Sequence, residues 1–277
     1  MPNYNHAPYL KERMDSILAQ DYSNIELIVL DDASTDDSWA VLQTYADDKR
    51  VKLMVRGEQN SGNTFVQWKK GLEAATGEYV WIAESDDVAE PMLVSRLMKE
   101  IEQNDAVVAF SNSVLIDSEG REIGRRHKKP WTQDFSMDGK DFVRRYLLGY
   151  NNIYNASAVL FSREAALRVD MDQVAQFKAS GDRLFWIEMA MQGRVAYIAR
   201  CLNRFRKHAH KVSNNAESRA QNIIEDHAIY TVAKQKVHVR PIDKWRILAY
   251  HWRAMMRSAV SKEGRLQAMK AWRAEVC

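Results

Sequence analysis

Residues 25–37, IELIVLDDASTDD, contain the pattern that decides the fold. A mostly apolar run of strand length ends at Leu30, and two acids, Asp31 and Asp32, follow it directly. Ser34 or Thr35 can then cap a helix predicted over 34–46. The cap explains the hydroxyl residues of this turn, but it leaves the two acids at the strand end without a local role.

A second strand ends in the same way. Residues 79–87 read YVWIAESDD, so a predicted strand over 79–83 is followed by Glu84, Asp86 and Asp87. Parallel strands present their carboxyl ends at one edge of a sheet, where α/β proteins bind ligands. The sequence therefore predicts that the acids of both strands gather along one edge.

The wider pattern is an alternation of strands and helices. Strands are predicted over 25–30, 51–55, 79–83 and 106–111, and helices over 8–19, 34–46, 64–75 and from Pro91. This order predicts an α/β protein with a mostly parallel sheet flanked by helices. Beyond it we expect a hairpin over 114–125, helices over 138–149 and 181–192, a strand over 155–162, short strands over 195–198 and 203–206, and a helical extension from about residue 220, interrupted at Pro241. We divide the chain into 1–112, 113–219 and 220–277.

Bulk properties narrow the class of protein. The 277 residues are 46% hydrophobic and 28% charged, as in folded globular proteins. No apolar run reaches membrane-spanning length, no signal-peptide layout begins the sequence, and two cysteines make no disulfide framework, so we expect a cytoplasmic protein. Residues 234–277 hold 11 Lys/Arg against 3 Asp/Glu, whereas residues 1–233 hold 29 against 34. This distribution of charge indicates that the acidic body handles metal and nucleotide, whereas the basic tail contacts an anionic surface.

The acids at the strand ends suit a divalent cation. Clustered carboxylates repel one another unless a cation neutralises them, and Mg²⁺ or Mn²⁺ is often held by one or two carboxylates together with substrate phosphates. The alternative interpretation is a solvated acidic turn before a helix that begins near Pro91. The local pattern alone leaves both interpretations open.

Four motifs in order resemble family 2 glycosyltransferases, which are inverting enzymes that use nucleotide sugars. They are PNYN at 2–5 with SILAQ at 16–20, ELIVLDDASTD at 26–36, NSGNTFVQWKKG at 60–71 with GEYVWIAESDD at 77–87, and GDRLFW at 181–186 with FRKH at 205–208. The resemblance implies a GT-A (Rossmann-like) fold whose nucleotide-sugar half is 1–112 and whose acceptor half is 113–219, with a basic helical extension over 220–277.

The resemblance also implies roles for single residues. Asp182 matches the catalytic base, and Asp86, with help from Asp87 and Glu84, matches the acidic element that binds metal and diphosphate. His208 matches a histidine near the diphosphate. Residues implied to bind the nucleotide are Pro2, Asn3, Tyr4, Asp31, Asp32, Asn60, Lys69 and Asp86. The implied cofactor is Mn²⁺ or Mg²⁺, the donor a nucleoside diphosphate sugar with UDP as the default, and the acceptor a saccharide or lipid-linked saccharide of a surface or secreted polysaccharide.

One departure from the family concerns the start of the sheet. Family members normally have an apolar strand before the segment that corresponds to Pro2–Tyr4, whereas Met1 directly precedes it here. We expect that the sequence is trimmed or that its start is misassigned.

The basic tail has an amphipathic pattern. Residues 243–259 are predicted to place six residues on one helical stripe flanked by Arg246, Arg253 and Arg257: Trp245, Leu248, Trp252, Met255, Met256 and Ala259. Such a stripe suits an anionic membrane surface, although it could instead pack on the domain. Nucleic acid fits poorly, because the body is acidic and has no recognised binding motif. The main rival is a nucleotide-sugar-binding scaffold without catalysis. A nucleotidyltransferase would need a Gly-rich basic loop near its N-terminus, and we find none.

Overall fold

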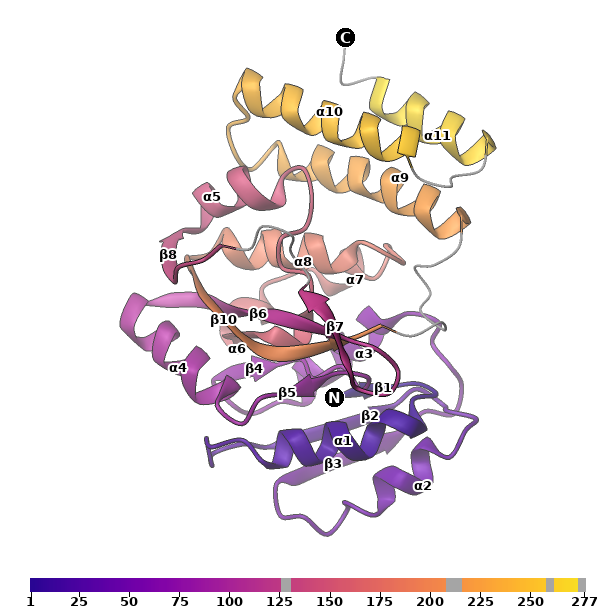
Figure 1. The fold of residues 1–277 in the computed structure, drawn as a ribbon, viewed down its shortest axis with the longest axis vertical. Coiled ribbons are helices and arrows are strands. Elements are labelled where there is room, and N and C mark those ends of the chain that lie inside the picture. The colour runs from indigo at the N-terminus through magenta and orange to yellow at the C-terminus, as the bar shows by residue number, and fades with distance from the viewer. Residues whose placement is uncertain (126–130, 208–215, 258–261, 274–277) are drawn as a thin grey trace.

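The computed structural model describes residues 1–125, 131–207, 216–257 and 262–273. Its elements lie in layers (Figure 1): a small sheet at the N-terminal end, a larger sheet in the middle, and helices α9–α11 at the opposite end. The α/β class, the flanking helices and the helical C-terminal extension are confirmed.

The small sheet is entirely parallel. Its order is β1-β2-β3, with bounds Pro2–Asn3, Leu27–Asp31 and Val51–Arg56. Helices α1 (Ala7–Leu18) and α2 (Ser38–Gln43) contact each other beside it. The helix predicted over 34–46 begins only at Ser38, because the Ser34 side chain bonds Asp31 instead of capping a helix.

The larger sheet is mixed, so the expectation of a mostly parallel sheet fails for this layer. Its order is β4-β9-β6-β10-β5, with β7 on β6 and β8 on β10, and of these pairs only β6 and β10 run parallel. The strand bounds are Tyr79–Trp81 (β4), Val88–Ala89 (β5), Ala106–Ile116 (β6), Glu122–Arg125 (β7), Phe135–Asp138 (β8), Val159–Ser162 (β9) and Arg194–Arg206 (β10). The hairpin over 114–125 is confirmed, whereas the two strands predicted near 195–206 are one strand with register shifts.

Helices cover the sheet and build the core. The helix predicted after Pro91 is α4, Leu93–Asn104, and Leu93, Leu97 and Ile101 are buried as its period requires. The largest apolar cluster centres on α8 and includes the fully buried Trp186. The other bounds are Thr64–Ala74 (α3), Gly139–Phe142 (α5) continued by a π-helical turn Val143–Leu147, Ala156–Ala158 (a 3₁₀ turn), Arg163–Leu167 (α6), Met171–Val174 (α7) and Gly181–Ala190 (α8).

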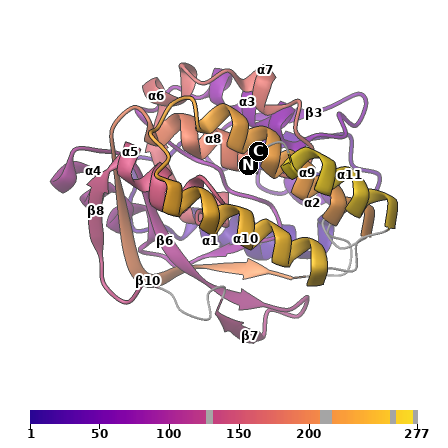
Figure 2. The same cartoon turned by 90° about the horizontal axis from the view of Figure 1, so that it is seen from above.

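The C-terminal helices extend this core. They are α9 (Ala216–Ala233), α10 (Pro241–Arg257) and α11 (Lys262–Arg273). Helix α9 contacts α8, and Figures 1 and 2 show α10 and α11 as the layer beyond it. None of the helices within the described residues is both long and apolar enough to cross a bilayer.

Candidate active site

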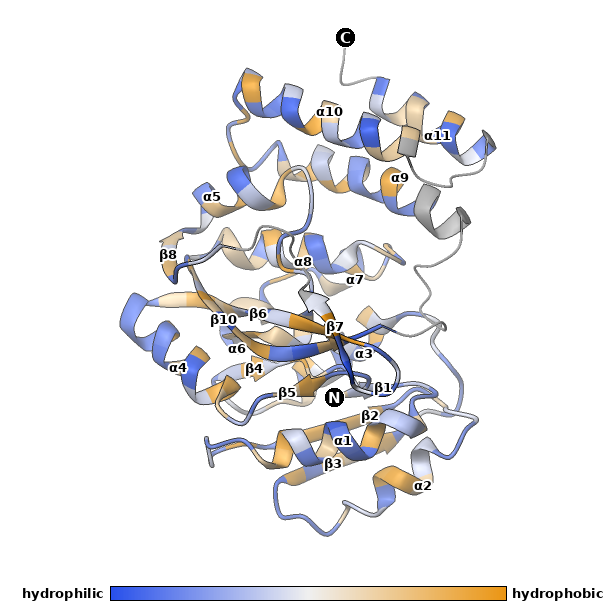
Figure 3. Cartoon of the chain, viewed as in Figure 1, coloured by the Kyte–Doolittle hydropathy of each residue, from blue (hydrophilic) through white to orange (hydrophobic). Residues whose placement is uncertain are grey.

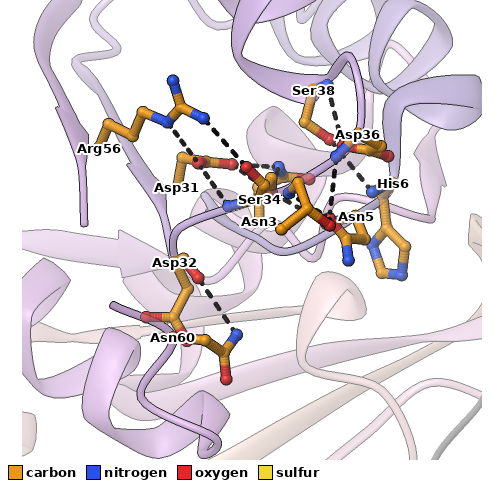
Figure 4. A network of polar contacts seen from close by, with 11 residues as sticks. Asn3, Asn5, His6, Asp31, Asp32, Ser34, Asp36, Ser38, Arg56 and Asn60 are labelled. Carbon is orange, nitrogen blue, oxygen red and sulfur yellow. Dashed lines mark hydrogen bonds and ion pairs between the residues drawn. The ribbon is translucent and has the colours of Figure 1, made fainter. Parts of the chain in front are cut away.

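The first acidic strand end is the centre of a buried polar network (Figure 4). The carboxylate of Asp31 accepts hydrogen bonds from Asn3 Nδ2 at 2.7 Å, from Ser34 Oγ at 2.6 Å and from the Ser34 backbone N–H at 3.0 Å. Arg56 lies 4.0 Å from the same carboxylate. Asn3 and Asp31 are both buried. The hydrogen bond between them holds β1 to the turn that follows β2.

Asp32 organises the next loop. Its carboxylate accepts hydrogen bonds from the Ser61 backbone N–H and hydroxyl and from Gln67 of α3. Asn60 Nδ2 donates to the Asp32 carbonyl at 3.1 Å. The structure therefore brings Asp32 and Asn60 together and fixes both through protein contacts.

The loop after β1 connects the two acidic strand ends. Asn5 has φ 53°, a left-handed conformation that Asn tolerates, and its Oδ1 accepts from the Thr35 N–H at 2.8 Å. His6 Nδ1 lies 2.8 Å from the hydroxyl of Ser85, which sits between Glu84 and Asp86. The two acidic turns are therefore linked through one loop, but β2 and β4 lie in separate sheets, so the predicted single edge of one parallel sheet is not observed.

The second acidic strand end concentrates negative charge. Burial, and then the neighbouring Asp86 charge, raise the pKa of Glu84 to about 7, although Trp68 Nε1 donates a 2.9 Å hydrogen bond to it. Asp86 is also buried. Burial is the larger cause of this rise, and buried Arg13 interacts electrostatically with Glu84, Asp86 and Asp87.

Asp87 accepts a hydrogen bond at each of its two carboxylate oxygens. One of its oxygens accepts from the Arg206 backbone N–H at 2.9 Å and the other from Asn155 Nδ2 at 2.7 Å. The buried Arg206 side chain also donates to the Asp86 carbonyl at 2.8 Å and pairs with Glu12 at 2.5 Å. Asp87 therefore ties the loop to the end of β10.

The residues present fit only one kind of metal site. Among the described residues, no three His, Cys, Asp or Glu side chains are grouped to surround a cation. A cage made by protein alone does not fit this arrangement. A Mg²⁺ or Mn²⁺ ion held mainly by diphosphate oxygens and water, with Asp86 as the protein ligand, does fit it.

Asp182 lies at the start of α8 and has the properties of a base. Its Oδ1 accepts from the Arg183 backbone N–H at 2.8 Å and its Oδ2 from Asn151 Nδ2 at 2.9 Å. Burial raises the pKa of Asp182 to about 7, although the Arg183 N–H bond opposes the rise. A carboxylate with this pKa can accept a proton near neutral pH.

One loop holds both carboxylates. Asn151 bonds Asp182, and Asn155 in the same loop bonds Asp87. Four residue steps span at most about 14 Å, so the base and the acidic edge lie beside one short segment. The structure thereby brings together two groups that are 95 positions apart in the sequence.

The C-terminal extension holds the segment that leads into α8 and Asp182. The buried Glu225 of α9 accepts hydrogen bonds from three consecutive backbone N–H groups, those of Lys178, Ala179 and Ser180, at 3.0, 2.9 and 2.9 Å. Arg183, also buried, donates to Asp226 of α9 at 2.7 Å. Helix α9 therefore helps to hold the start of α8, where Asp182 lies.

The remaining predicted residues are more scattered. Tyr4 is 43% exposed beside the network, and Pro2 is buried in β1. Lys69 forms a surface ion pair of 2.6 Å with Asp172 of α7, which gives it a partner other than a diphosphate. His208 lies outside the described residues.

Sequence reasoning missed the residues that hold the acids in place. Asn151, Asn155, Arg206 and Glu225 bond the acidic groups or the loop before α8, yet none carries a local signal in the sequence that separates it from an ordinary surface residue. Only Arg206 lies in a motif singled out beforehand, FRKH at 205–208.

Comparisons with known proteins match this chain to glycosyltransferases. The family model described as glycosyl transferase family 2 matches residues 1–170. An uncharacterized glycosyltransferase of Haemophilus influenzae is 27% identical over 260 residues, covering 90% of this chain and 78% of that protein. The putative teichuronic acid biosynthesis glycosyltransferase TuaG of Bacillus subtilis is 26% identical over 216 residues, covering 77% and 80%. Three other relatives match over less than half of their own length.

Solved structures share the fold. TarS 1–349 of S. aureus, in complex with UDP-GlcNAc, superposes with a TM-score of 0.74 and 19% identity over 99% of this chain and 79% of that one. The mannosyltransferase PcManGT of Pyrobaculum calidifontis, in complex with GDP-Man and Mn²⁺, gives 0.56 and 19% over 100% and 79%.

Proposed function

The chain belongs to glycosyl transferase family 2, and from this membership we propose that it transfers a sugar from a nucleoside diphosphate to an acceptor hydroxyl with inversion at the anomeric carbon. Its fold is that of the GT-A glycosyltransferases. The observation that carries the proposal is the loop that holds Asp182 and Asp87 together through Asn151 and Asn155.

In the proposed reaction Asp182 is the general base. The acceptor oxygen attacks the anomeric carbon, its proton passes to Asp182, and the bond between that carbon and the diphosphate oxygen breaks with the electron pair leaving on the diphosphate. The bonds from Asn151 and from the Arg183 N–H keep the carboxylate oriented, and a pKa near 7 leaves a large ionised fraction at neutral pH.

We place the donor along the acidic edge. Tyr4, Asp32 and Asn60 are proposed to contact the nucleotide, with Pro2, Asn3 and Asp31 shaping the surface that they share. A divalent cation bound at Asp86 would neutralise the charge of the departing diphosphate. UDP is the proposed nucleotide, in keeping with the UDP-GlcNAc bound to TarS, and the Mn²⁺ of PcManGT supports the proposed cofactor.

The acceptor that we propose is a saccharide or lipid-linked saccharide in the synthesis of a surface polysaccharide. The name of TuaG supports this class. The rival is a scaffold that binds nucleotide sugars without catalysis. Binding alone does not require a base, so the oriented Asp182 with its raised pKa favours the enzyme.

The test separates binding from chemistry. Calorimetry with UDP, GDP and TDP, with and without Mn²⁺, identifies the nucleotide. UDP release from a panel of UDP-sugars in the presence of a cell-wall saccharide pool then measures transfer. Asp182→Asn should lower transfer by roughly 10³-fold and leave nucleotide affinity unchanged. Asp170→Asn, which alters the cap of α7, is the matched control. Full transfer by Asp182→Asn would refute the assignment.

We also propose that helix α10 binds an anionic membrane surface, which would place the enzyme at the cytoplasmic face of a membrane. Ile247, His251 and Met255 face inward, and His251 Nε2 lies 2.7 Å from the Gly149 carbonyl. Met255, assigned to the membrane stripe from the sequence, therefore packs on the domain. Trp245 and Trp252 are 63% and 52% exposed.

The outward face of α10 combines apolar and basic groups. Ile242 and Met256 are more than half exposed on the same side as the two tryptophans, and Arg246 and Arg253 are exposed beside them. Figure 3 shows hydrophobic and hydrophilic segments interleaved along this outermost helix. Exposed Trp with Arg is typical of helices that lie in the lipid headgroup region.

Vesicle flotation tests the membrane proposal. The double variant Trp245→Ala/Trp252→Ala should lose binding to vesicles that contain phosphatidylserine. Leu167→Ala, which removes an exposed apolar side chain of α6, should bind as wild type does. Equal flotation of all three proteins would rule this surface out.

A further inference from the structure

Three consecutive carbonyls shortly before Asn151 accept hydrogen bonds from buried side chains. Arg183 of α8 donates to the carbonyls of residues 147 and 148, to the first of them at 2.7 Å. His251 of α10 bonds the next one, because its Nε2 lies 2.7 Å from the Gly149 carbonyl. Arg183 and His251 are each only 1% exposed. The segment that leads to Asn151 is therefore held from two sides, by the helix of the proposed base and by the C-terminal extension.

The surroundings of His251 define its protonation. A carbonyl oxygen can only accept, so Nε2 carries the hydrogen in the bond to Gly149. Nδ1 lies 3.9 Å from the Asp226 carboxylate, which is beyond hydrogen-bonding distance. Burial, the largest cause, and then the Arg183 charge lower the pKa of His251 to about 3, so the ring is neutral near pH 7. His251 is therefore a neutral donor to the Gly149 carbonyl.

Helices α9 and α11 hold the imidazole ring in place. The ring stacks on the indole of Trp272 in α11, with centroids 4.1 Å apart and planes 19° apart. Trp272 Nε1 in turn donates to the Ile223 carbonyl of α9 at 3.2 Å. The orientation of the His251 donor is thus set by all three helices of the C-terminal extension.

Helix α10 packs closely against the segment that His251 bonds. A Cβ at Gly149 would lie 2.8 Å from Ile247 Cγ1, well inside the 3.5–4.0 Å at which carbon atoms pack. The next residue, Tyr150, contacts Tyr250 of α10 with ring centroids 5.0 Å apart. A glycine at position 149 therefore permits the close approach, and Asn151 follows directly after the two residues that lie on α10.

Asn151 carries this placement to Asp182. Its Oδ1 accepts from the Ile153 N–H at 3.0 Å, and its Nδ2 donates to Asp182 Oδ2 at 2.9 Å. Both ends of the amide are bonded, so its direction depends on where the main chain of residues 149–153 lies. Two residue steps separate Gly149 from Asn151, a distance of at most about 7 Å. A shift of Gly149 away from α10 would therefore move the group that orients the carboxylate.

We propose that His251 is a positioning residue for sugar transfer: by holding the Gly149 carbonyl it keeps Asn151 aimed at Asp182. The proposal rests on the proposed function, in which Asp182 is the general base. His251 acts through Asn151 and takes no part in the proton transfer itself. The inner face of α10 thereby has a role in catalysis that is separate from the membrane contact proposed for its outer face.

The first test separates the hydrogen bond from the packing of the ring. His251→Phe keeps a flat ring that can stack on Trp272 but removes the donor. It should lower kcat roughly 10-fold and leave nucleotide affinity and the KM for the nucleotide sugar unchanged. His251→Gln, whose amide nitrogen can donate to the same carbonyl, should restore most of the loss. His238→Phe, at an exposed histidine between α9 and α10, is the matched control and should behave as wild type does.

Two further measurements ask whether His251 acts through Asn151. Adding His251→Phe to Asn151→Ala should lower kcat by less than about twofold, because changes that remove the same contact are not additive. The Ile153 amide, which donates to Asn151, should exchange its hydrogen roughly 10-fold faster in His251→Phe. The Ser157 amide, which donates to Asn155 Oδ1 at 2.7 Å further along the chain, is the internal control and should be unchanged.

The proposal is overturned by unchanged kcat in His251→Phe, by a loss that His251→Gln does not restore, by a full additional loss in the double variant, or by unchanged Ile153 exchange. If His251→Phe does not fold, Gly149→Ala should give the same loss of kcat and the same faster exchange, because its Cβ pushes the segment from α10; normal values would again overturn the proposal. A wild type without transfer would refute the proposed function, whereas Ile153 exchange would still decide whether His251 holds Asn151.

Discussion

Replacing Asn151 by Ala tests how the structure sets the acidity of the proposed base. The Asn151 amide donates to Asp182 Oδ2 at 2.9 Å and so stabilises the ionised carboxylate. Without this bond the carboxyl should hold its proton to higher pH. The variant therefore changes the protonation of Asp182 and leaves the carboxylate itself in place.

The size of the effect follows from the strength of the bond. A hydrogen bond to a charged group contributes about 1.5–3 kcal/mol, and the lower end applies because Asp182 is only partly buried. One pKa unit corresponds to about 1.4 kcal/mol, so the pKa of Asp182 should rise from about 7 to about 8. At pH 7 the ionised fraction then falls from about one half to about one tenth, and kcat/KM falls about fivefold.

The assay is the pH profile of kcat/KM for sugar transfer. Wild type should show an acidic limb near pH 7 that moves up by about one unit in Asn151→Ala, with the high-pH plateau nearly unchanged. Asn152→Ala is the matched control, since Asn152 donates to the Tyr146 carbonyl and does not touch Asp182. An unmoved limb in Asn151→Ala, or the same movement in both variants, would refute the reasoning.

Three further predictions concern the acidic groups and their supports. Asp86→Ala should abolish Mn²⁺-dependent UDP binding by calorimetry with normal folding, whereas Asp87→Asn should mainly lower stability because two donors lose their charged acceptor; the same phenotype in both would contradict this division. Glu225→Gln should lower the free energy of unfolding by about 2 kcal/mol in urea titrations, because a neutral acceptor replaces the carboxylate that holds three N–H groups, while the exposed Glu164→Gln should not. Burial raises the pKa of both Glu84 and Asp182 to about 7, so the folded chain retains protons that the unfolded chain releases above about pH 4, and the free energy of unfolding should fall as pH rises from there to about 7. Asp182→Asn should reduce that slope, and an identical slope would contradict the assignment.

The parts of the fold that the sequence predicted are those set by local periodicity. Strand β2 and helix α4 follow directly from their apolar patterns, and both lie within a few residues of the predicted bounds. The acids were correctly expected at the ends of β2 and β4, whereas the single parallel sheet that was expected to gather them is two separate sheets. These conclusions needed only neighbouring residues and general sheet geometry.

The features that escaped prediction depend on distant partners or on irregular backbone. Strand β10 reads as two short strands, because register shifts between Ile198 and Asn203 break its alternation. The direction of pairing in the larger sheet is set by long connections that leave no periodic signal. Glu225 looks like one more charged residue of a helix until the chain folds and places three N–H groups against it.

The bonds of Glu225 limit how this protein can be recombined with its relatives. Helix α9 follows the sheet in sequence and looks like a detachable module, yet its carboxylate shapes the turn that presents the proposed base. A chimera that exchanges the acceptor half for that of another transferase would have to carry α9 along with it. A junction near residue 215 would separate the base from its scaffold.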